Sequence, residues 1–279
     1  MKKIHMFCLS TKPETLSFIK KAGYIPVGLG EKKFNNLWLR DITKKNISKK
    51  NLYYGENTFH YWLWKNKLKT LPKNTWIGFC QYRRFWHIND KKNSDQISRS
   101  VNQYNFLKSI LRYEKKEWND YDVVLGEPLI VDKIKLSKIL KNGGINSILN
   151  NLSLFLKREV NVKFHFDIFH GNGNLEKAIT KLDNINREDF KNFVIQNKSF
   201  NRVNMFICRK PKIMELYYKS LFKWLKKCES IFGFEKSSYG RTRIYAFLSE
   251  RYLSYWFKKN TRYLEWPIFF FDPTIKSSY

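Results

Sequence analysis

Apolar positions along the chain fall into short blocks that are separated by longer, partly polar segments. The short blocks are bounded by glycine, proline or polar residues, as β-strands are. In the block at 75–80 the apolar character is continuous, which predicts a strand that is buried on both faces of a sheet. The expected strands lie at residues 3–10, 24–30, 75–80, 121–128 and 202–210.

The longer segments show the spacing of helices. Residues 211–232 begin with proline and carry apolar residues at helical spacing, whereas 241–257 is apolar on most sides, as a buried helix is. Strands that alternate with helices predict an α/β fold, with a mostly parallel central sheet flanked by helices and a mainly helical C-terminal half. The expected helical segments lie at about residues 13–22, 55–68, 100–116, 133–197, 211–232 and 241–257.

Composition indicates one folded unit. Of the 279 residues 43% are hydrophobic and 17% aromatic, glycine and proline are scarce, and no low-complexity linker divides the chain. A chain of this length and composition can bury a large core. We therefore expect a single domain over residues 1–279.

The charge is strongly positive. Lysine and arginine number 53 against 24 acidic residues, which gives a net charge of +29. Such an excess attracts nucleic acid, an anionic membrane surface or phosphorylated ligands, and the charge alone does not choose among them. Most of the excess is lysine, and a coding bias toward A and T also enriches lysine without any function.

Cysteine usage and the apolar runs indicate the compartment. The four cysteines are far apart without a CxxC pair, which disfavours a zinc ribbon and fits a reducing environment. The N-terminal apolar stretch is too short for a signal peptide, and no apolar run approaches the roughly 20 residues of a membrane span. We expect a cytoplasmic protein, with peripheral contact to the inner face of the plasma membrane as an extension of that expectation.

The segment "CQYRRFW" at 80–86 follows a predicted buried strand. Ligands of parallel α/β sheets bind beyond the carboxyl ends of the strands. Arg83 and Arg84 at such an end can neutralise a diphosphate through charge-assisted hydrogen bonds, and Tyr82 can form a wall of the site. The alternative is a solvated basic turn.

Glu250 is an acidic residue within the mostly apolar segment 241–257. A buried carboxylate needs a partner, and either Arg243 or Arg251 can serve. The residue is then either half of a structural ion pair or a general base that acts on an acceptor hydroxyl.

Two acidic segments are candidates for a metal site. Asp120 and Asp122 lie at the start of a strand, the wrong end for a ligand site, and are interpreted as structural. In "HFDIFH" (165–170) the spacing of five does not stack the two histidines on one helix face. We therefore assign no metal ligands.

Taken together and in order, four segments resemble a family of bacterial capsular and exopolysaccharide biosynthesis proteins long described as a domain of unknown function. Members are regarded as glycosyltransferases, some of the galactofuranosyl type, with a Rossmann-related fold like that of the A-type (GT-A) nucleotide-sugar transferases. The resemblance extends from about Ile4 to Phe257. The segments are "NISKKNLYYGENTFHYWLWKN", "WIGFCQYRRFW", "NMFICRK" and "RIYAFLSERYLSYWF".

The resemblance implies roles for individual residues. Glu250 would be the catalytic base, and the donor diphosphate would bind at Gln81, Tyr82, Arg83 and Arg84. The chain departs from the family pattern at Gln81, where histidine is usual; glutamine can replace a hydrogen-bond donor but not a group that transfers a proton. Further substrate contacts are implied at Asn51, Glu56, Thr58, Lys65, Asn66, His170, Asn204 and Arg251.

The function implied is transfer of a sugar from a nucleotide-diphosphate donor, such as a UDP-sugar of the galactofuranose type, to a capsular or other surface polysaccharide. Residues 1–130 would bind the donor and 131–279 the acceptor, which is a glycan or a lipid-linked sugar at the anionic inner membrane. We expect the arginines to replace a metal, so that no cofactor is needed; Mn²⁺ or Mg²⁺ is the alternative.

Two other functions stay open. A basic nucleic-acid-binding protein would explain the charge and the aromatic residues, although the basic residues are spread along the chain. A non-catalytic binding protein of a glycan pathway would explain the departure at Gln81.

Overall fold

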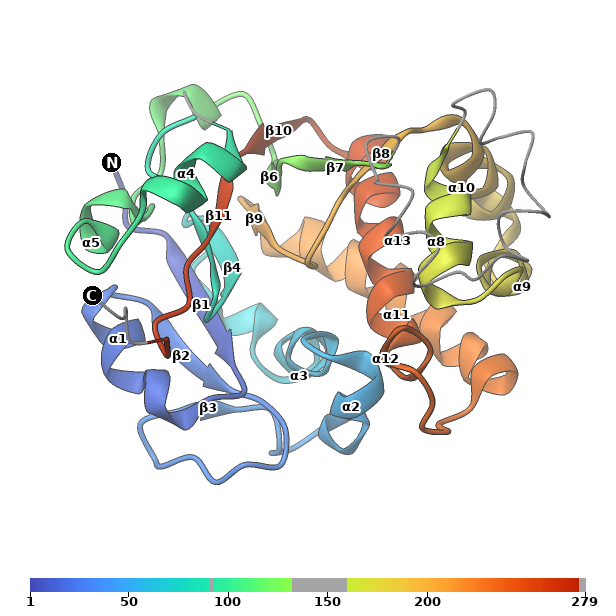
Figure 1. Ribbon diagram of the computed structural model, residues 1–279, viewed down its shortest axis with the longest axis horizontal. Coiled ribbons are helices and arrows are strands. Elements are labelled where there is room, and N and C mark those ends of the chain that lie inside the picture. Colours follow the sequence, from blue (N-terminus) through green and yellow to red (C-terminus); the bar gives the residue numbers. More distant parts are fainter. Residues whose placement is uncertain (91–92, 132–159, 276–279) are drawn as a thin grey trace.

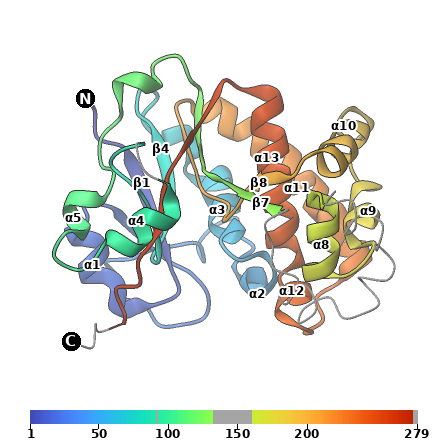
Figure 2. The ribbon, with the colours of Figure 1, turned by 45° about the horizontal axis from the view of Figure 1, so that its top comes forward.

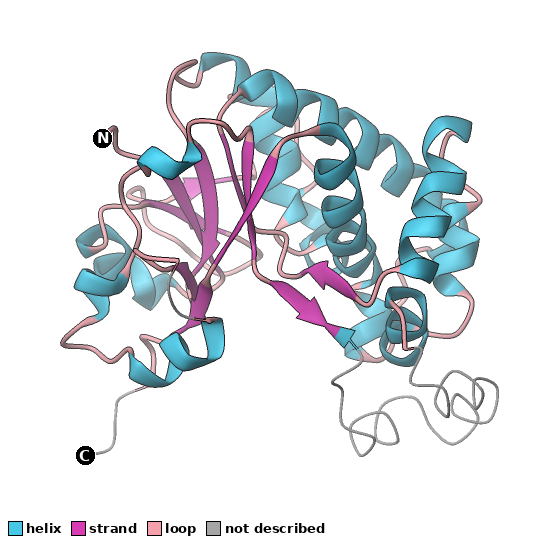
Figure 3. Ribbon diagram, turned by 90° about the horizontal axis from the view of Figure 1, so that it is seen from above, coloured by secondary structure: helices cyan, strands magenta, loops and turns pink. Residues whose placement is uncertain are grey.

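A mostly parallel sheet with helices on both faces forms the centre of the molecule (Figures 1 and 3). The computed structural model describes residues 1–90, 93–131 and 160–275. Within them, nine strands form the central sheet, so the predicted α/β fold is confirmed. The main path runs, from edge to edge, through β10 (Tyr263–Trp266), β6 (Val123–Gly126), β9 (Phe206–Cys208), β4 (Ile77–Gln81), β1 (His5–Ser10), β2 (Ile25–Gly28) and β3 (Leu39–Arg40).

Strand β9 is the exception to the parallel order of this path. It is antiparallel to both of its neighbours, β4 and β6, whereas the other pairs along the path are parallel. The mostly parallel sheet that the sequence predicts would place the carboxyl end of 202–210 at the ligand edge, but β9 runs in the opposite direction. An apolar run carries no information about strand direction. The amino end of β9, next to Asn204, lies beside the carboxyl end of β4 instead.

The arginine motif forms a tight turn between paired strands. Strand β5 (Arg84–Trp86) folds back on β4 so that Gln81 pairs with Arg84, which leaves Tyr82 and Arg83 in the turn. Strand β11 (Ile268–Phe270) then pairs with β5 in antiparallel register. A separate two-stranded sheet joins β7 (Pro128–Ile130) to β8 (Ser199–Asn201).

Alternation along β1 shows how the sheet buries both faces. Phe7 and Leu9 belong to one hydrophobic core, and Met6 and Cys8 belong to the other. This is the period of two that a strand imposes on its side chains. The second core packs against the helices α1 (Leu16–Lys21), α4 (Ser94–Ser100) and α5 (Phe106–Ser109).

The first core is covered by longer helices from the helical C-terminal half. Helices α8, α9 and α10 pack beyond α11 and α13, on the side away from the sheet (Figure 2). The bounds on this side are α2 (Asn51–Tyr54), α3 (Asn57–Asn66), α8 (Val162–His170), α9 (Asn174–Ile179), α10 (Asn184–Gln196), α11 (Pro211–Phe232), α12 (Tyr239–Thr242) and α13 (Ile244–Asn260). Short 3-10 helices lie at Pro13–Thr15, Ser48–Lys50, Leu68–Thr70 and Lys116–Trp118.

The predicted helices have different outcomes. The helix at 211–232 is confirmed with the same bounds. The helix predicted at 100–116 is wrong: α4 ends at Ser100, and the only α-helix inside the segment is the four-residue α5. Ile110 and Tyr113 instead form β-bridges to His87 and Lys3, so tertiary pairing overrides the local pattern. Part of the segment at 133–197 lies outside the described residues.

None of the helices among the described residues is both long enough and apolar enough to span a membrane.

Candidate active site

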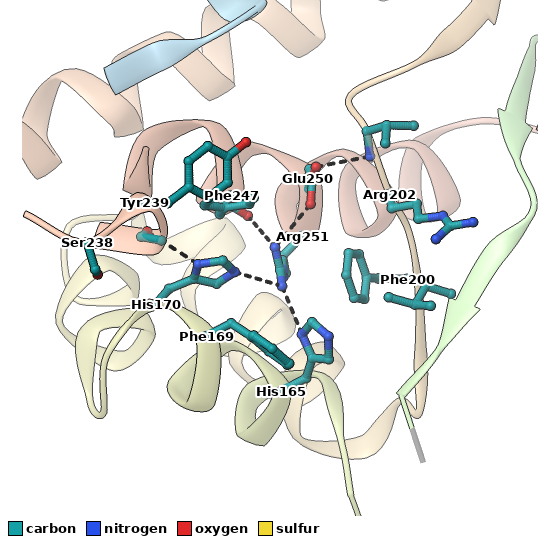
Figure 4. Close-up of a pocket in the computed structure, with 13 residues that line it drawn as sticks. His165, Phe169, His170, Phe200, Arg202, Ser238, Tyr239, Phe247, Glu250 and Arg251 are labelled. Atoms are coloured by element: carbon teal, nitrogen blue, oxygen red, sulfur yellow. Dashed lines mark hydrogen bonds and ion pairs between the residues drawn. The ribbon is translucent and has the colours of Figure 1, made fainter. Parts of the chain in front are cut away.

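Two pockets adjoin at the edge of the sheet where β1, β2 and β4 end. The larger, of about 640 Å³, lies among α8, β8, α12 and α13 (Figure 4), and the smaller, of about 200 Å³, lies at the ends of β1, β2 and β4. Tyr239 lines both. A pocket of the larger size, with aromatic walls and a few polar groups, is typical of small-molecule sites.

Glu250 is a largely buried carboxyl in the wall of the larger pocket. Its Oε1 accepts a hydrogen bond from the Val203 backbone N–H at 3.1 Å, and its Oε2 lies 3.2 Å from Arg251 Nη1. Burial raises the pKa of Glu250 to about 7, although the nearby charge of Arg251 opposes the rise. A carboxyl with this pKa can accept a proton at neutral pH.

Arg251 is held by two histidines. It is 1% exposed, and its Nη2 lies 3.0 Å from His165 Nδ1 and 3.3 Å from His170 Nε2. Because arginine only donates hydrogen bonds, both of these ring nitrogens must be acceptors. Burial and the charge of Arg251 hold the pKa of His170 well below its usual range, which keeps that ring neutral. His170 and Arg251 therefore lie together and fix the position of Glu250.

The turn that precedes β9 has an unusual backbone. Val203 and Asn204 have φ angles of +71° and +48°, in the left-handed region that a β-branched residue rarely adopts. Both backbone polar groups of Val203 are engaged, since its N–H donates to Glu250 and its carbonyl accepts from Gln81 Nε2 at 3.0 Å. Gln81 thus acts here as a hydrogen-bond donor to the backbone that positions Glu250.

The side chain of Asn204 gathers a buried polar network. Its Nδ2 donates to Glu56 Oε1 at 2.8 Å and to the Ala246 carbonyl at 3.1 Å, and its Oδ1 accepts from Ser249 Oγ at 2.6 Å. Glu56 Oε2 lies 3.5 Å from Arg243. Of the two partners considered for Glu250, Arg251 is therefore the one that pairs with it, and Arg243 pairs with Glu56.

The two arginines of the motif have different surroundings. Arg83 lines the smaller pocket, lies 3.7 Å from Asp272 and has its guanidinium over the Tyr82 ring. The half-buried Arg84 lies near Arg202, and the pKa of Arg84 is lowered first by burial and then by the Arg202 charge. Sequence reasoning did not select Arg202, although a basic residue directly before "VNMF" was the signal available.

Asn51 and Thr58, two of the predicted substrate-contacting residues, are hydrogen-bonded to each other beside the smaller pocket. Asn51 lines that pocket, and its Nδ2 donates to Thr58 Oγ1 at 3.1 Å and to the Gly55 carbonyl at 2.9 Å. Thr58 itself is buried. The pair ties the start of α3 to α2 beside the pocket.

Lys65 and Asn66 lie elsewhere, at the end of α3. Asn66 Nδ2 donates to the carbonyls of Lys45 and Trp62, each at 2.8 Å, and Lys65 Nζ lies over the Trp64 ring. Neither residue lines the larger or the smaller pocket. The structure does not bring them together with Glu250.

Asp122 and Asp167, two of the acidic residues in the segments tested for metal binding, have cationic partners. Asp122 lies before β6, accepts from the Arg262 backbone N–H and pairs with Lys210. Asp167 lies 2.8 Å from Lys163, one turn away on α8. The structural interpretation of Asp122 agrees with these contacts.

Replacement of Asn204 tests the network and the left-handed turn separately. We expect Asn204→Ala to lower the free energy of unfolding by about 2–4 kcal/mol, since it removes three buried hydrogen bonds and keeps the backbone strain. Asn204→Gly loses the same bonds but adopts the positive φ freely, so it should cost about 1 kcal/mol less. Denaturant unfolding measures both, and a glycine variant less stable than the alanine variant would contradict the role of the strain.

Replacement of Gln81 tests its contact with the turn. Gln81→Leu leaves the Val203 carbonyl without its donor, and we expect a loss of about 1–3 kcal/mol in unfolding free energy. Gln81→His should recover part of this, because an imidazole N–H can donate. The control is Gln96→Leu on the exposed face of α4, expected within about 0.5 kcal/mol of the wild type. Equal effects of the two leucine variants would rule out the contact as a support.

The comparisons with known proteins agree with this fold. The solved chain described as "WbbM bifunctional glycosytransferase apo structure" matches with a TM-score of 0.69 at 18% sequence identity. The match covers 100% of this chain and 48% of that one, so this chain spans about half of its length. The expected glycosyltransferase-like fold is thereby confirmed. No curated protein matches the chain.

A family model covers most of the sequence. It matches residues 6–261 and is described as "Domain of unknown function (DUF4422)". The match includes the arginine turn, the Val203–Asn204 turn and Glu250. The chain therefore belongs to the DUF4422 family.

Proposed function

We propose that this protein is a glycosyltransferase that moves a sugar from a nucleotide-diphosphate donor to a glycan acceptor. The observation that carries the proposal is Glu250, a carboxyl with a pKa of about 7 in the wall of an aromatic-lined pocket, near the cationic Arg84. A base can deprotonate the acceptor hydroxyl and a nearby cation can stabilise the departing diphosphate, which are the two tasks of glycosyl transfer by direct displacement. The likeness of the fold to a solved glycosyltransferase supports the same function.

The proposed step uses these groups as follows. The Glu250 carboxylate accepts the proton of an acceptor hydroxyl, and the hydroxyl oxygen forms a bond to the anomeric carbon of the donor sugar. The bond from that carbon to the diphosphate oxygen breaks, and the diphosphate leaves with the electron pair. The arginine turn supplies the cation: Arg84, near Glu250, binds the diphosphate and stabilises its charge.

The two pockets suit the two substrates. We assign the donor nucleotide to the smaller pocket, at the strand ends of residues 1–130, and the acceptor to the larger pocket, built mainly from residues 131–279. In the larger pocket the rings of Phe169, Phe200 and Phe247 offer flat apolar faces for a sugar.

The finer assignments rest on the sequence resemblance and the charge. We propose a UDP-sugar as donor, of the galactofuranose type, and a capsular or other surface polysaccharide as acceptor. The net charge of +29 would hold a cytoplasmic enzyme near anionic lipids and a lipid-linked acceptor.

Nucleotide binding provides the first test of this function. We expect UDP or a UDP-sugar to raise the melting temperature in a thermal-shift screen, and excess chelator to leave the rise unchanged because arginines supply the positive charge. A rise that vanishes in chelator and returns with Mn²⁺ would disprove metal independence. Stabilisation by oligonucleotides, with no response to any nucleotide, would instead favour a nucleic-acid-binding protein.

The pH dependence of Glu250 provides the second test. We expect kcat to rise as the pH increases through about 7, where Glu250 loses its proton, and Glu250→Gln to lower kcat by about 100-fold or more. Because folding raises the pKa from 4.5 to about 7, the folded state binds more protons between these values. The stability of the wild type relative to Glu250→Gln should therefore fall as the pH increases across that window. Near-normal turnover of the variant, with lower stability, would assign Glu250 a structural role.

A further inference from the structure

Arg84 and Arg202 differ from the other arginines around the two pockets. Neither guanidinium forms an ion pair or a hydrogen bond with any residue in the described part of the chain; that of Arg84 lies over the Phe270 ring at 5.6 Å. Both side chains are half-buried. The neighbouring arginines are each paired with a carboxylate: Arg83 with Asp272, Arg243 with Glu56 and Arg251 with Glu250.

A chain of contacts joins the two turns on which these arginines lie. Arg84 is the cross-strand partner of Gln81, and Gln81 Nε2 donates to the carbonyl of Val203, the residue after Arg202. Arg202 lines the larger pocket, and Figure 4 shows its guanidinium extended away from Arg251. The arginine turn and the left-handed turn, each of which carries one of these cations, are thus joined through Gln81.

The charges around Arg84 have an excess of positive charge. Among the charges near Arg84, that of Arg202 has the largest effect on its pKa and lowers it, which is the sign of two repelling cations. Glu250 is the nearby anion, but its carboxylate already pairs with Arg251. Two guanidinium groups that repel one another, neither of them paired with a carboxylate in the described part of the chain, are an arrangement that a bridging polyanion stabilises.

We infer that Arg84 and Arg202 form one diphosphate-binding site beside Glu250, with Arg83 outside it on the side of the smaller pocket. The inference deepens the proposed function and rests on it for the identity of the diphosphate as a substrate group. The sequence resemblance assigned the diphosphate to two consecutive arginines, Arg83 and Arg84. The inference assigns it instead to Arg84 and Arg202, which come from turns that are far apart in the sequence. The site lies beside the catalytic carboxyl, where a leaving group must be bound.

A diphosphate at this place has two possible sources. It is either the diphosphate of the nucleotide donor or the pyrophosphate of a lipid-linked acceptor. Both present the same oxygen atoms to the guanidinium groups, so inorganic pyrophosphate serves as the common probe.

Calorimetric titration with pyrophosphate in excess chelator tests the site. We expect Arg84→Gln and Arg202→Gln each to weaken binding by about tenfold or more, since each removes charge-assisted hydrogen bonds. Arg202→Lys should keep part of the affinity, because lysine retains the charge but not the planar fork. Arg83→Gln is the matched control from the same turn, and its effect should be smaller.

Thermal unfolding of the same variants shows whether weaker binding results from a loss of folded structure. Arg202→Gln removes one of two repelling charges, so its melting temperature should equal or exceed that of the wild type. Wild-type protein that does not bind pyrophosphate, or an Arg202→Gln variant with unchanged affinity, would overturn the inference, as would a larger effect of Arg83→Gln.

Competition then identifies the source. Displacement of pyrophosphate by UDP assigns the site to the donor, displacement by a soluble prenyl diphosphate assigns it to the acceptor, and either supports the site. A protein that binds pyrophosphate through Arg84 and Arg202 but transfers no sugar would contradict the proposed function and leave this inference standing.

Discussion

The left-handed turn at Val203 and Asn204 is the constraint on which the candidate site depends. Each residue with positive φ costs about 1–2 kcal/mol relative to the right-handed conformation. The turn persists because its polar groups are satisfied from several directions, by Gln81, Glu250 and Glu56. Strain of this kind persists only where the surrounding structure determines it, and it is typical of functional sites.

The turn also joins parts of the chain that are distant in sequence. Gln81 ends a central strand, Glu56 begins a helix near the N-terminus, and Glu250 lies in a late helix, yet all three contact the same two residues. The position of the carboxyl is therefore coupled to the packing of the sheet against α3 and α13. A substitution in any of these elements can move Glu250 without touching it.

The lengths of the apolar runs were sufficient to predict the α/β fold and α11, because burial on one or both faces leaves a local pattern. The direction of β9 was not predictable, since its apolar residues read the same in either direction. The positive φ of Val203 was not predictable either, because valine rarely adopts the left-handed conformation.

The partners of the candidate residues were only partly predictable. Arg243 lies two helical turns before Glu250 and so was a natural partner, but tertiary packing places Glu56 beside Arg243. The approach of Arg202 to Arg84 depends on the turn before β9, which no local pattern revealed. Lys65 and Asn66 belong to the same sequence motif as Glu56, yet the helix carries them away from the pockets.

The pairing of β5 with β11 has a consequence for the synthesis of the protein. Phe270 lies under Arg84, and Asp272 lies beside Arg83, so the last described strand supplies the neighbours of the arginine turn. Chains emerge from the ribosome with their N-terminal residues first. The turn at 82–83 is thus made early but receives its partners only after some 190 more residues have been added, which ties the completion of this cationic edge to the synthesis of β11 and Asp272.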